Sequence, residues 1–313
     1  MAAITEIKDY KLPGGWSGDA TSGSVDACRR SERGEILLFT GIPFKLPTED
    51  QQFLLAQKQA ESRFHKNISY RPKTDEIRGV DRQGNDDAAH QQLQAIMRNY
   101  SAEVARFTRQ LLAPYAEKIA LDFASFRPLE EQGRDLPLKK RNDLLHVDAF
   151  PTRPTRGARI LRVFTNINPT ESRRWLTGEP FHAIAPRFAD SAGLREFAYS
   201  SNSTTGKARR AAVSTLRSIG LPVPDRSGYD RFMLHFHDWL KENGSYQEEE
   251  RAKPVQEFLP GCTWLVFTDG VPHAALSGRF ALEHTFIVPR EVLVEPDVAP
   301  ISVLESLSGC KLD

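Results

Sequence analysis

The sequence predicts an α+β fold: a double-stranded β-helix (jelly-roll) core with N-terminal buttressing helices and a helical insertion. Two patterns predict the order of these parts, because helical periodicity occupies residues 48–118 and strand-like segments dominate residues 121–290. A third observation is that strands and helices do not alternate around a Gly-rich phosphate loop, which disfavours a doubly wound sheet. We expect residues 1–313 to form a single domain, with ample length for a buried core.

The N-terminal third is predicted to be mainly helical. Residues 1–35 are rich in Gly and Ser, and we expect a loosely ordered N-terminal extension that leads into an edge strand at residues 35–39. The pattern becomes helical at Thr48, which has N-cap character and is followed by acidic residues. A charged stretch at residues 70–87 is interpreted as a loop. Residues 93–111 then carry apolar side chains three and four positions apart, which predicts a long helix that packs against a sheet.

Apolar and β-branched segments separated by turns predict the strands of the core. They lie at residues 121–126, 144–150, 160–168, 263–268 and 279–288. A helical insertion at about residues 187–245 divides them. It holds a basic helical piece near residues 207–218 and an amphipathic helix at residues 230–241. The tail after Pro289 is expected to be peripheral.

Charge and cysteine content narrow the function classes. The formal net charge is +1, so no global field points to nucleic acid. Cys28, Cys262 and Cys310 form no C-x-x-C pair, which disfavours a zinc ribbon or disulfide scaffold and favours a reducing compartment. No apolar stretch has the length of a signal peptide core or a membrane span. We therefore expect a cytoplasmic protein without a nucleic-acid partner, and the sequence leaves a homo-oligomer open.

The triplet His146-Val147-Asp148 is the strongest candidate for chemistry. Side chains two residues apart on a strand share one face, so His146 and Asp148 are expected to point the same way. His273 follows a strand and a Gly/Pro-bounded turn far downstream, and it supplies a third ligand. Two His and one carboxylate leave the opposite coordination positions open. This set suits non-haem Fe(II), which must also bind a co-substrate and O2.

Other histidines compete for these roles. His284 is the alternative to His273, but it lies in the middle of a predicted strand, whereas His273 sits in a turn from which a ligand can reach inward. His235 and His237 form a second cluster with Asp238. Residues two apart on a helix point to different faces, so we interpret these two as ordinary helix residues.

Arginines near the predicted metal site point to anionic ligands. Arg279, at the start of the last strand, offers the fork that matches the far carboxylate of a 2-oxoacid. Thr285, on the same strand face, and Asn166 are the further candidates for co-substrate binding. Arg290 is the weaker alternative to Arg279, because it follows Pro289 and lies beyond the strand.

A basic cluster follows the triplet and is offset by a single acid, Glu171. Its members are Arg153, Arg156, Arg159, Arg162, Arg173 and Arg174. A cation-rich rim beside a metal suggests an anionic substrate. Arg127, Arg162 and Arg174 are the candidate substrate contacts, and Trp175 offers an apolar face to a sugar ring. The alternative is that these arginines lie on the surface and only keep it solvated.

Three segments resemble the bacterial Kdo hydroxylases, which are Fe(II)/2-oxoglutarate-dependent dioxygenases. These segments are residues 144–164 (LLHVDAFPTRPTRGARILRVF), 165–181 (TNINPTESRRWLTGEPF) and 264–286 (WLVFTDGVPHAALSGRFALEHTF). The resemblance extends over roughly residues 30–295. It implies that His146, Asp148 and His273 are the iron ligands and that 2-oxoglutarate and O2 are co-substrates. The usual gap between the distal His and the 2-oxoglutarate Arg is nearer ten residues than the six that separate His273 from Arg279.

The resemblance also implies a substrate. It is 3-deoxy-D-manno-oct-2-ulosonic acid (Kdo) on a lipid A precursor, hydroxylated at C3 to give Ko in the inner core of lipopolysaccharide. The carboxylates and phosphates of this substrate suit the arginine cluster, and peripheral contact with the inner face of the inner membrane is expected. Three alternatives stay open: another 2-oxoglutarate-dependent hydroxylase acting on a small anionic or protein substrate, a cupin-like sugar-binding barrel, and a zinc hydrolase on the same ligands.

Overall fold

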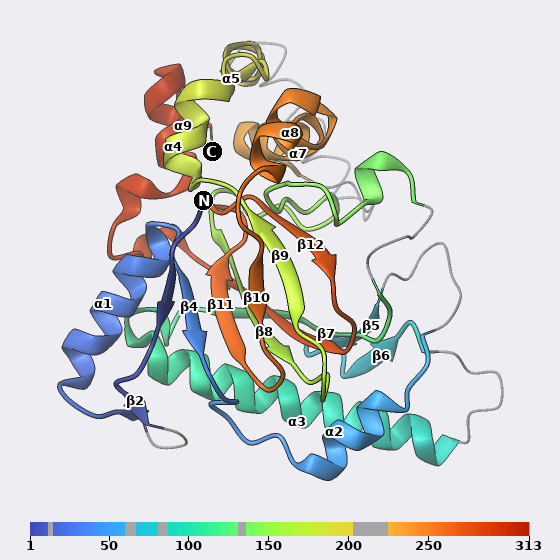
Figure 1. Ribbon diagram of the computed structural model, residues 1–313. Coiled ribbons are helices and arrows are strands. Elements are labelled where there is room, and N and C mark those ends of the chain that lie inside the picture. Colours follow the sequence, from blue (N-terminus) through green and yellow to red (C-terminus); the bar gives the residue numbers. More distant parts are fainter. Residues whose placement is uncertain (12–14, 60–66, 81–86, 131–135, 203–224, 313) are drawn as a thin grey trace, which may run out of the picture.

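The structure, a computed structural model, describes the chain except residues 12–14, 60–66, 81–86, 131–135, 203–224 and 313. Helices and β-sheet are layered. Two sheets stack at the centre, with one group of helices along their lower side and a second group above them (Figure 1). This arrangement confirms the α+β class predicted from the sequence.

In the part of the chain that the structure describes, the strands form one large and two smaller sheets. They are β1 (Ile4–Glu6), β2 (Tyr10–Lys11), β3 (Gly15–Trp16), β4 (Ile36–Phe39), β5 (Ile68–Arg71), β6 (Glu76–Arg78), β7 (Ala120–Arg127), β8 (Arg159–Asn166), β9 (Arg173–Thr177), β10 (Gln256–Phe258), β11 (Thr263–Phe267), β12 (His273–Ser277) and β13 (Ala281–Val288). The large sheet has the order β1-β4-β11-β8-β13-β7-β5-β6, and the second sheet has the order β10-β9-β12. Among the described residues, strands β2 and β3 pair only with each other.

Alternation along the central strands separates the two faces of the large sheet. On β13, Leu282 and Phe286 belong to the main hydrophobic core, whereas Glu283, on the other face, pairs with Arg127 of β7 and Arg162 of β8. On β8, Phe164 packs against Trp175 of β9, with ring centres 4.8 Å apart. The space between the two sheets therefore holds aromatic and charged side chains, and the apolar face is turned to the helices.

Eight α-helices complete the described part of the chain. They are α1 (Ala20–Glu32), α2 (Thr48–Leu55), α3 (Asp87–Leu111), α4 (Phe181–Phe188), α5 (Leu194–Asn202), α7 (Gly228–Glu242), α8 (Gly244–Arg251) and α9 (Pro300–Ser308). The amphipathic α3 packs on β7 and β5 through the apolar stripe predicted from the sequence, and it lies below the sheets in Figure 1. No helix among the described residues is long and apolar enough to cross a bilayer.

Several expectations about the N-terminal third are wrong. Residues 1–35 are not loosely ordered throughout, because helix α1 buries a stripe of small side chains that includes Ala27 and Cys28. Strand β4 is not an edge strand, since β1 and β11 flank it. The stretch 70–87 contains the β5–β6 hairpin in addition to turns. Short strands and small buried residues leave weak periodic patterns, which explains these misses.

Two further expectations need correction. Residues 144–150 do not form a regular strand; they contribute one isolated bridge between His146 and His273. The tail after Pro289 is not peripheral, because α9 packs on α4 and α5 and buries Ile301 and Leu304. The predicted helical piece at residues 207–218 lies outside the described residues.

Candidate metal centre and its pocket

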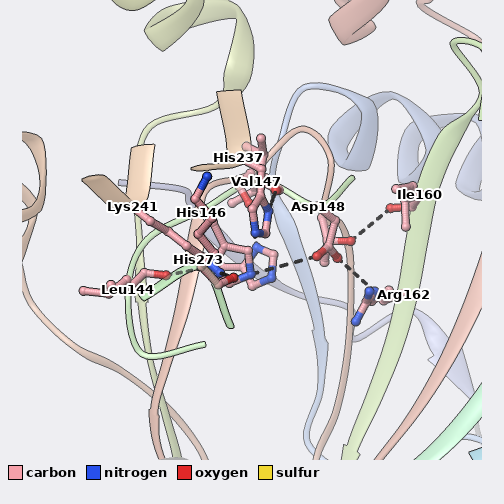
Figure 2. A network of polar contacts seen from close by, with 12 residues as sticks. Leu144, His146, Val147, Asp148, Ile160, Arg162, His237, Lys241 and His273 are labelled. Atoms are coloured by element: carbon pink, nitrogen blue, oxygen red, sulfur yellow. Dashed lines mark hydrogen bonds and ion pairs between the residues drawn. The ribbon is translucent and has the colours of Figure 1, made fainter. Parts of the chain in front are cut away.

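The structure brings His146, Asp148 and His273 together between the two sheets (Figure 2). One ligand atom from each residue lies within 4.8 Å of the other two, and His146 Nε2 is 4.0 Å from Asp148 Oδ1. Backbone hydrogen bonds fix this geometry. His146 and His273 exchange N–H···O bonds of 3.2 and 3.0 Å, and the Asp148 N–H donates to the Thr268 carbonyl at 2.9 Å. The isolated bridge between His146 and His273 therefore positions the ligands, where the sequence predicts a regular strand.

Backbone carbonyls orient both imidazole rings. His146 Nδ1 lies 2.7 Å from the Leu144 oxygen, and His273 Nδ1 lies 2.9 Å from the Val271 oxygen. A carbonyl oxygen only accepts, so each Nδ1 must carry the proton. Each Nε2 is then left with a free lone pair, which is the tautomer that binds a metal ion.

The protonation states also suit a cation. Burial lowers the pKa of His146, and the neighbouring His273 lowers it further. Burial likewise lowers the pKa of His273. For Asp148, burial raises the pKa, but the Arg162 guanidinium and other neighbours outweigh it and hold the pKa at about 2. Two neutral imidazoles and one ionised carboxylate are therefore ready to ligate without losing protons first.

A second layer of side chains supports the ligands, and sequence reasoning missed its main member. The His237 ring, on α7, lies edge-on to the His146 ring with centres 4.8 Å apart, and its Nδ1 is 2.7 Å from the Val147 oxygen. Its interpretation as an ordinary helix residue is wrong. Lys241, one helical turn further along, is buried and donates to the Lys139 carbonyl at 3.0 Å. Only the fold brings this helix to the triplet, so local spacing carries no signal of it.

The three ligands open onto a cavity of about 360 Å³. Its walls carry arginine side chains from three strands, β7, β8 and β9, and lysines from α7 and from the segment before the triplet. The lining includes Arg127, Arg162, Arg173, Trp175, Lys139, Lys140, Lys241 and His237. A metal centre beside so many cations is suited to anionic ligands.

An ion-pair chain runs from the metal ligand into the space between the sheets. Arg162 Nε is 3.0 Å from Asp148 Oδ2, and Arg162 Nη1 is 2.6 Å from Glu283 Oε1. The other Glu283 oxygen lies 2.7 Å from Arg127 Nη2. Burial raises the pKa of Glu283, but the two guanidinium groups overcome this and lower it. All four side chains are largely buried, so these contacts are only weakly screened by solvent.

Of the four predicted substrate contacts, three line the cavity and one points away from it. Arg127, Arg162 and Trp175 line the cavity, and the Trp175 ring stacks on His273 with centres 5.2 Å apart. Arg174 does not line it: the side chain is half exposed and pairs with Glu257 on β10. Its neighbour Arg173 takes the inward position, which the alternation with the buried Trp175 indicates.

The residues predicted to bind the co-substrate lie elsewhere. Arg279 is 52% exposed, is paired with Glu171 at 3.8 Å and does not line the cavity. Positive φ angles at Gly278 and Phe280 delay the start of β13 to Ala281, so Arg279 falls outside the strand alternation.

The other two predicted co-substrate residues are buried, and neither lines the cavity. The Asn166 side chain donates to the backbone oxygens of Glu171 and Phe258, so it holds the β8–β9 turn. Thr285 lies in β13 opposite Arg162.

The other histidines considered as metal ligands lie outside the cluster. His284 lies on the opposite face of β13, where its Nε2 is 2.8 Å from Ser101 Oγ of α3. The His235 ring lies against the Phe197 ring in a tilted arrangement, with ring centres 5.1 Å apart. Neither belongs to the ligand cluster formed by the other three residues.

Comparison with known proteins places this geometry in a family. The model of the 3-deoxy-D-manno-oct-2-ulosonic acid (Kdo) hydroxylase family matches residues 17–311. No curated protein sequence matches. The apo structure of the Kdo hydroxylase KdoO, a non-haem Fe(II) α-ketoglutarate-dependent dioxygenase, is 32% identical, covers 99% of this chain and 97% of its own, and superposes with a TM-score of 0.82.

Two ligand complexes of KdoO are similar to the same extent. The complex with α-ketoglutarate and Fe(III) gives a TM-score of 0.80, and the complex with succinate and Fe(III) gives 0.79, each at 32% identity over 99% of this chain and 97% of that one. The family match spans nearly all of the chain, and the similarity to KdoO covers almost its full length. The chain therefore belongs to the Kdo hydroxylase family.

Proposed function

We propose that this chain hydroxylates Kdo, using Fe(II), 2-oxoglutarate and O2. The observation that carries the proposal is the buried His146–Asp148–His273 cluster, open on one side to a cation-lined cavity, in a chain of this family. When bound, Fe(II) would supply the chemistry by which O2, 2-oxoglutarate and a C–H bond become a C–OH bond, succinate and CO2. The residues of the chain would hold and orient the metal ion, the co-substrate and the sugar.

His146 Nε2, His273 Nε2 and an Asp148 oxygen would hold the metal ion. Their tautomers and charges support this assignment, since both Nδ1 atoms are tied to carbonyls and the carboxylate is ionised. Two neutral nitrogens and one anionic oxygen on one side of an ion match the ligand preference of Fe(II) in such enzymes. The open cavity leaves room on the other side for the co-substrate and O2.

Arg127 and Arg162 would receive the far carboxylate of 2-oxoglutarate. The buried Glu283 contacts both guanidinium groups and holds them at the cavity wall, where an incoming carboxylate would meet them. Glu283 lies ten residues after His273, at the distance where the wider family has its 2-oxoglutarate Arg. Arginines from β7 and β8 flank that position and would replace it.

The lysines of the cavity wall would bind the carboxylate of the sugar. Lys139, Lys140 and Lys241 line the cavity. The Lys241 side chain is buried next to the metal ligands, so its charge acts at low dielectric constant on a group bound there. We propose C3 of Kdo on a lipid A precursor as the carbon hydroxylated, giving Ko, with peripheral contact between the protein and the inner face of the inner membrane.

We also propose that the two stacked sheets are a jelly roll. From β7 onward the chain passes between them: β7, the His146 bridge, β8, β9 and β10, β11, β12 and β13. Strands β7, β8, β11 and β13 lie side by side in the large sheet, and β9, β10 and β12 lie in the other. This is the winding expected of a double-stranded β-helix whose metal ligands lie between its sheets.

The test is turnover after anaerobic reconstitution with Fe(II). On admission of O2, succinate release should be stimulated by Kdo-lipid A and should require 2-oxoglutarate, and mass spectrometry should find one added oxygen atom in the sugar. A zinc hydrolase would act without O2 or 2-oxoglutarate. Stimulation by small acids or peptides in place of Kdo-lipid A would contradict the proposed substrate.

A further inference from the structure

A second group of cations lies near the metal cavity, around the Phe150 and Phe123 rings. Phe150 lines the cavity, and the Arg162 guanidinium carbon is 5.9 Å from its ring centre. The Arg153 guanidinium carbon lies 4.5 Å from the same ring centre. The Phe150 ring therefore contacts Arg153 and also lines the cavity in which the sugar would be hydroxylated.

Aromatic stacking holds two guanidinium groups close together here. Arg153 lies over the Phe123 ring at 4.0 Å, and Arg71 of β5 lies over the same ring at 4.8 Å. Stacking fixes the plane of a guanidinium and leaves its N–H edge free to bind an anion. Burial lowers the pKa of Arg153, and the nearby charges of Arg162 and Arg71 lower it further, which shows how closely these cations are crowded.

The local acids do not neutralise this group. Asp122 pairs with Arg153 at 3.1 Å. Arg71 has no ion pair within 4 Å among the described residues. The Nε atoms of both arginines are buried and have no hydrogen-bond partner in the described part of the structure. Buried guanidinium N–H groups without an acceptor cost free energy, and a bound anion would recover it.

The loop that carries Arg153 is held in place. The Asp230 carboxylate, in the capping box of α7, accepts from the Thr155 and Arg156 backbone N–H groups at 2.8 and 3.0 Å. Arg226 donates to the Pro151 carbonyl. The guanidinium of Arg153 is therefore presented by a braced loop, which lowers the entropy cost of binding a ligand there.

We propose that Arg71 and Arg153 form a second anion site, which binds an acidic group of the acceptor other than the carboxylate of the Kdo that is hydroxylated. The inference rests on the proposed function, since it assigns this group to the same acceptor molecule. Two acidic groups fit the site: a phosphate of the lipid A part or the carboxylate of a neighbouring Kdo. Both present anionic oxygens that a guanidinium binds through paired hydrogen bonds.

The test compares Arg71→Gln, Arg153→Gln and the matched control Arg106→Gln. Arg106 is an exposed arginine of α3, paired with Glu103. We expect each of the first two substitutions to raise the KM for Kdo-lipid A about tenfold, as loss of a charged hydrogen bond would. The kcat and the KM for 2-oxoglutarate should stay at wild-type values, and the control should not differ from wild type.

Acceptors that lack one group identify the ligand. If the effect of the substitutions disappears on dephosphorylated acceptor, the site binds phosphate; if it disappears on a single-Kdo acceptor, the site binds the second carboxylate. Persistence of the effect on an acceptor that lacks both groups would overturn the inference. So would an unchanged KM in both variants of an enzyme that is active.

Titration calorimetry measures the Kd of the acceptor for the metal-free protein and needs no turnover. The Kd should rise about tenfold in Arg71→Gln and Arg153→Gln but not in Arg106→Gln. Wild-type protein that binds the acceptor in this pattern yet does not hydroxylate it would refute the proposed reaction and leave the anion site supported. Equal affinity in all four proteins would refute the anion site.

Discussion

Replacing Glu283 by Gln tests the ion-pair chain that joins the metal ligand to the proposed 2-oxoglutarate site. The side chain keeps its size but loses its charge. It makes contacts of 2.8 and 2.7 Å with Arg127 and 2.6 Å with Arg162, and its exposed fraction is 5%. Loss of one partner of a buried ion pair costs about 3 kcal/mol. At about 2 °C for each kcal/mol in a chain of this length, the melting temperature should fall by about 6 °C.

The same substitution should destabilise the protein but strengthen the binding of 2-oxoglutarate. Without the Glu283 charge the two guanidinium groups lose the carboxylate that both of them contact, so the far carboxylate of 2-oxoglutarate should bind more tightly. We therefore expect 2-oxoglutarate to raise the melting temperature of Mn(II)-loaded Glu283→Gln more than that of wild type at equal concentration.

Thermal denaturation with and without 2-oxoglutarate measures both effects. Glu257→Gln is the control, because Glu257 is half exposed and its pair with Arg174 lies outside the cavity. A surface pair of this kind contributes less than about 1 kcal/mol. Two results would refute the assignment of Arg127 and Arg162 to 2-oxoglutarate binding. One is a melting temperature of Glu283→Gln equal to that of wild type, and the other is a 2-oxoglutarate-induced rise in melting temperature no larger than that of wild type.

Four further predictions follow from the site. Asp148→Ala should abolish succinate release and Fe(II) binding, measured by calorimetry; retained activity would remove Asp148 from the ligand set. His237→Phe should weaken Fe(II) binding about tenfold through loss of the bond to Val147, and an unchanged Kd would contradict its supporting role. Arg279→Gln should leave the KM for 2-oxoglutarate unchanged, whereas a large rise would restore the role predicted from the sequence. Finally, the metal-free protein should lose stability as the pH falls below about 6.5. Burial holds the pKa of His237 and His284 at about 4, so the unfolded chain binds protons that the folded chain does not, at a slope of about 1.4 kcal/mol per pH unit for each histidine. Urea titrations between pH 7 and pH 4 measure this slope, and a flat profile would contradict it.

Long, regular patterns in the sequence were sufficient to predict the main elements. The apolar stripe of residues 93–111 predicts α3, and the segments at 160–168, 263–268 and 279–288 correspond to β8, β11 and β13. Helix α1 was missed because its buried face is made of Ser24, Ala27, Cys28 and Ser31, which carry little hydrophobic signal. Such small residues let the helix backbone lie close to its neighbours, and this contact is visible only in the folded structure.

The ligand set was predictable because its chemistry is local. A His and an Asp two residues apart, with a downstream His, are enough to suggest a metal centre, and the structure brings these three side chains together. The arginines were not predictable in detail. Register decides that Arg173 points inward and Arg174 outward, and the positive φ at Phe280 decides that Arg279 lies outside β13. These facts depend on pairing between distant strands.

The most direct test of the central claim is an anaerobic crystal structure with Mn(II) and 2-oxoglutarate. The account predicts one ion bound by Nε2 of His146, Nε2 of His273 and an oxygen of Asp148. It also predicts that the far carboxylate of 2-oxoglutarate lies against Arg127 and Arg162. An ion bound elsewhere, or a co-substrate held by Arg279, would contradict it.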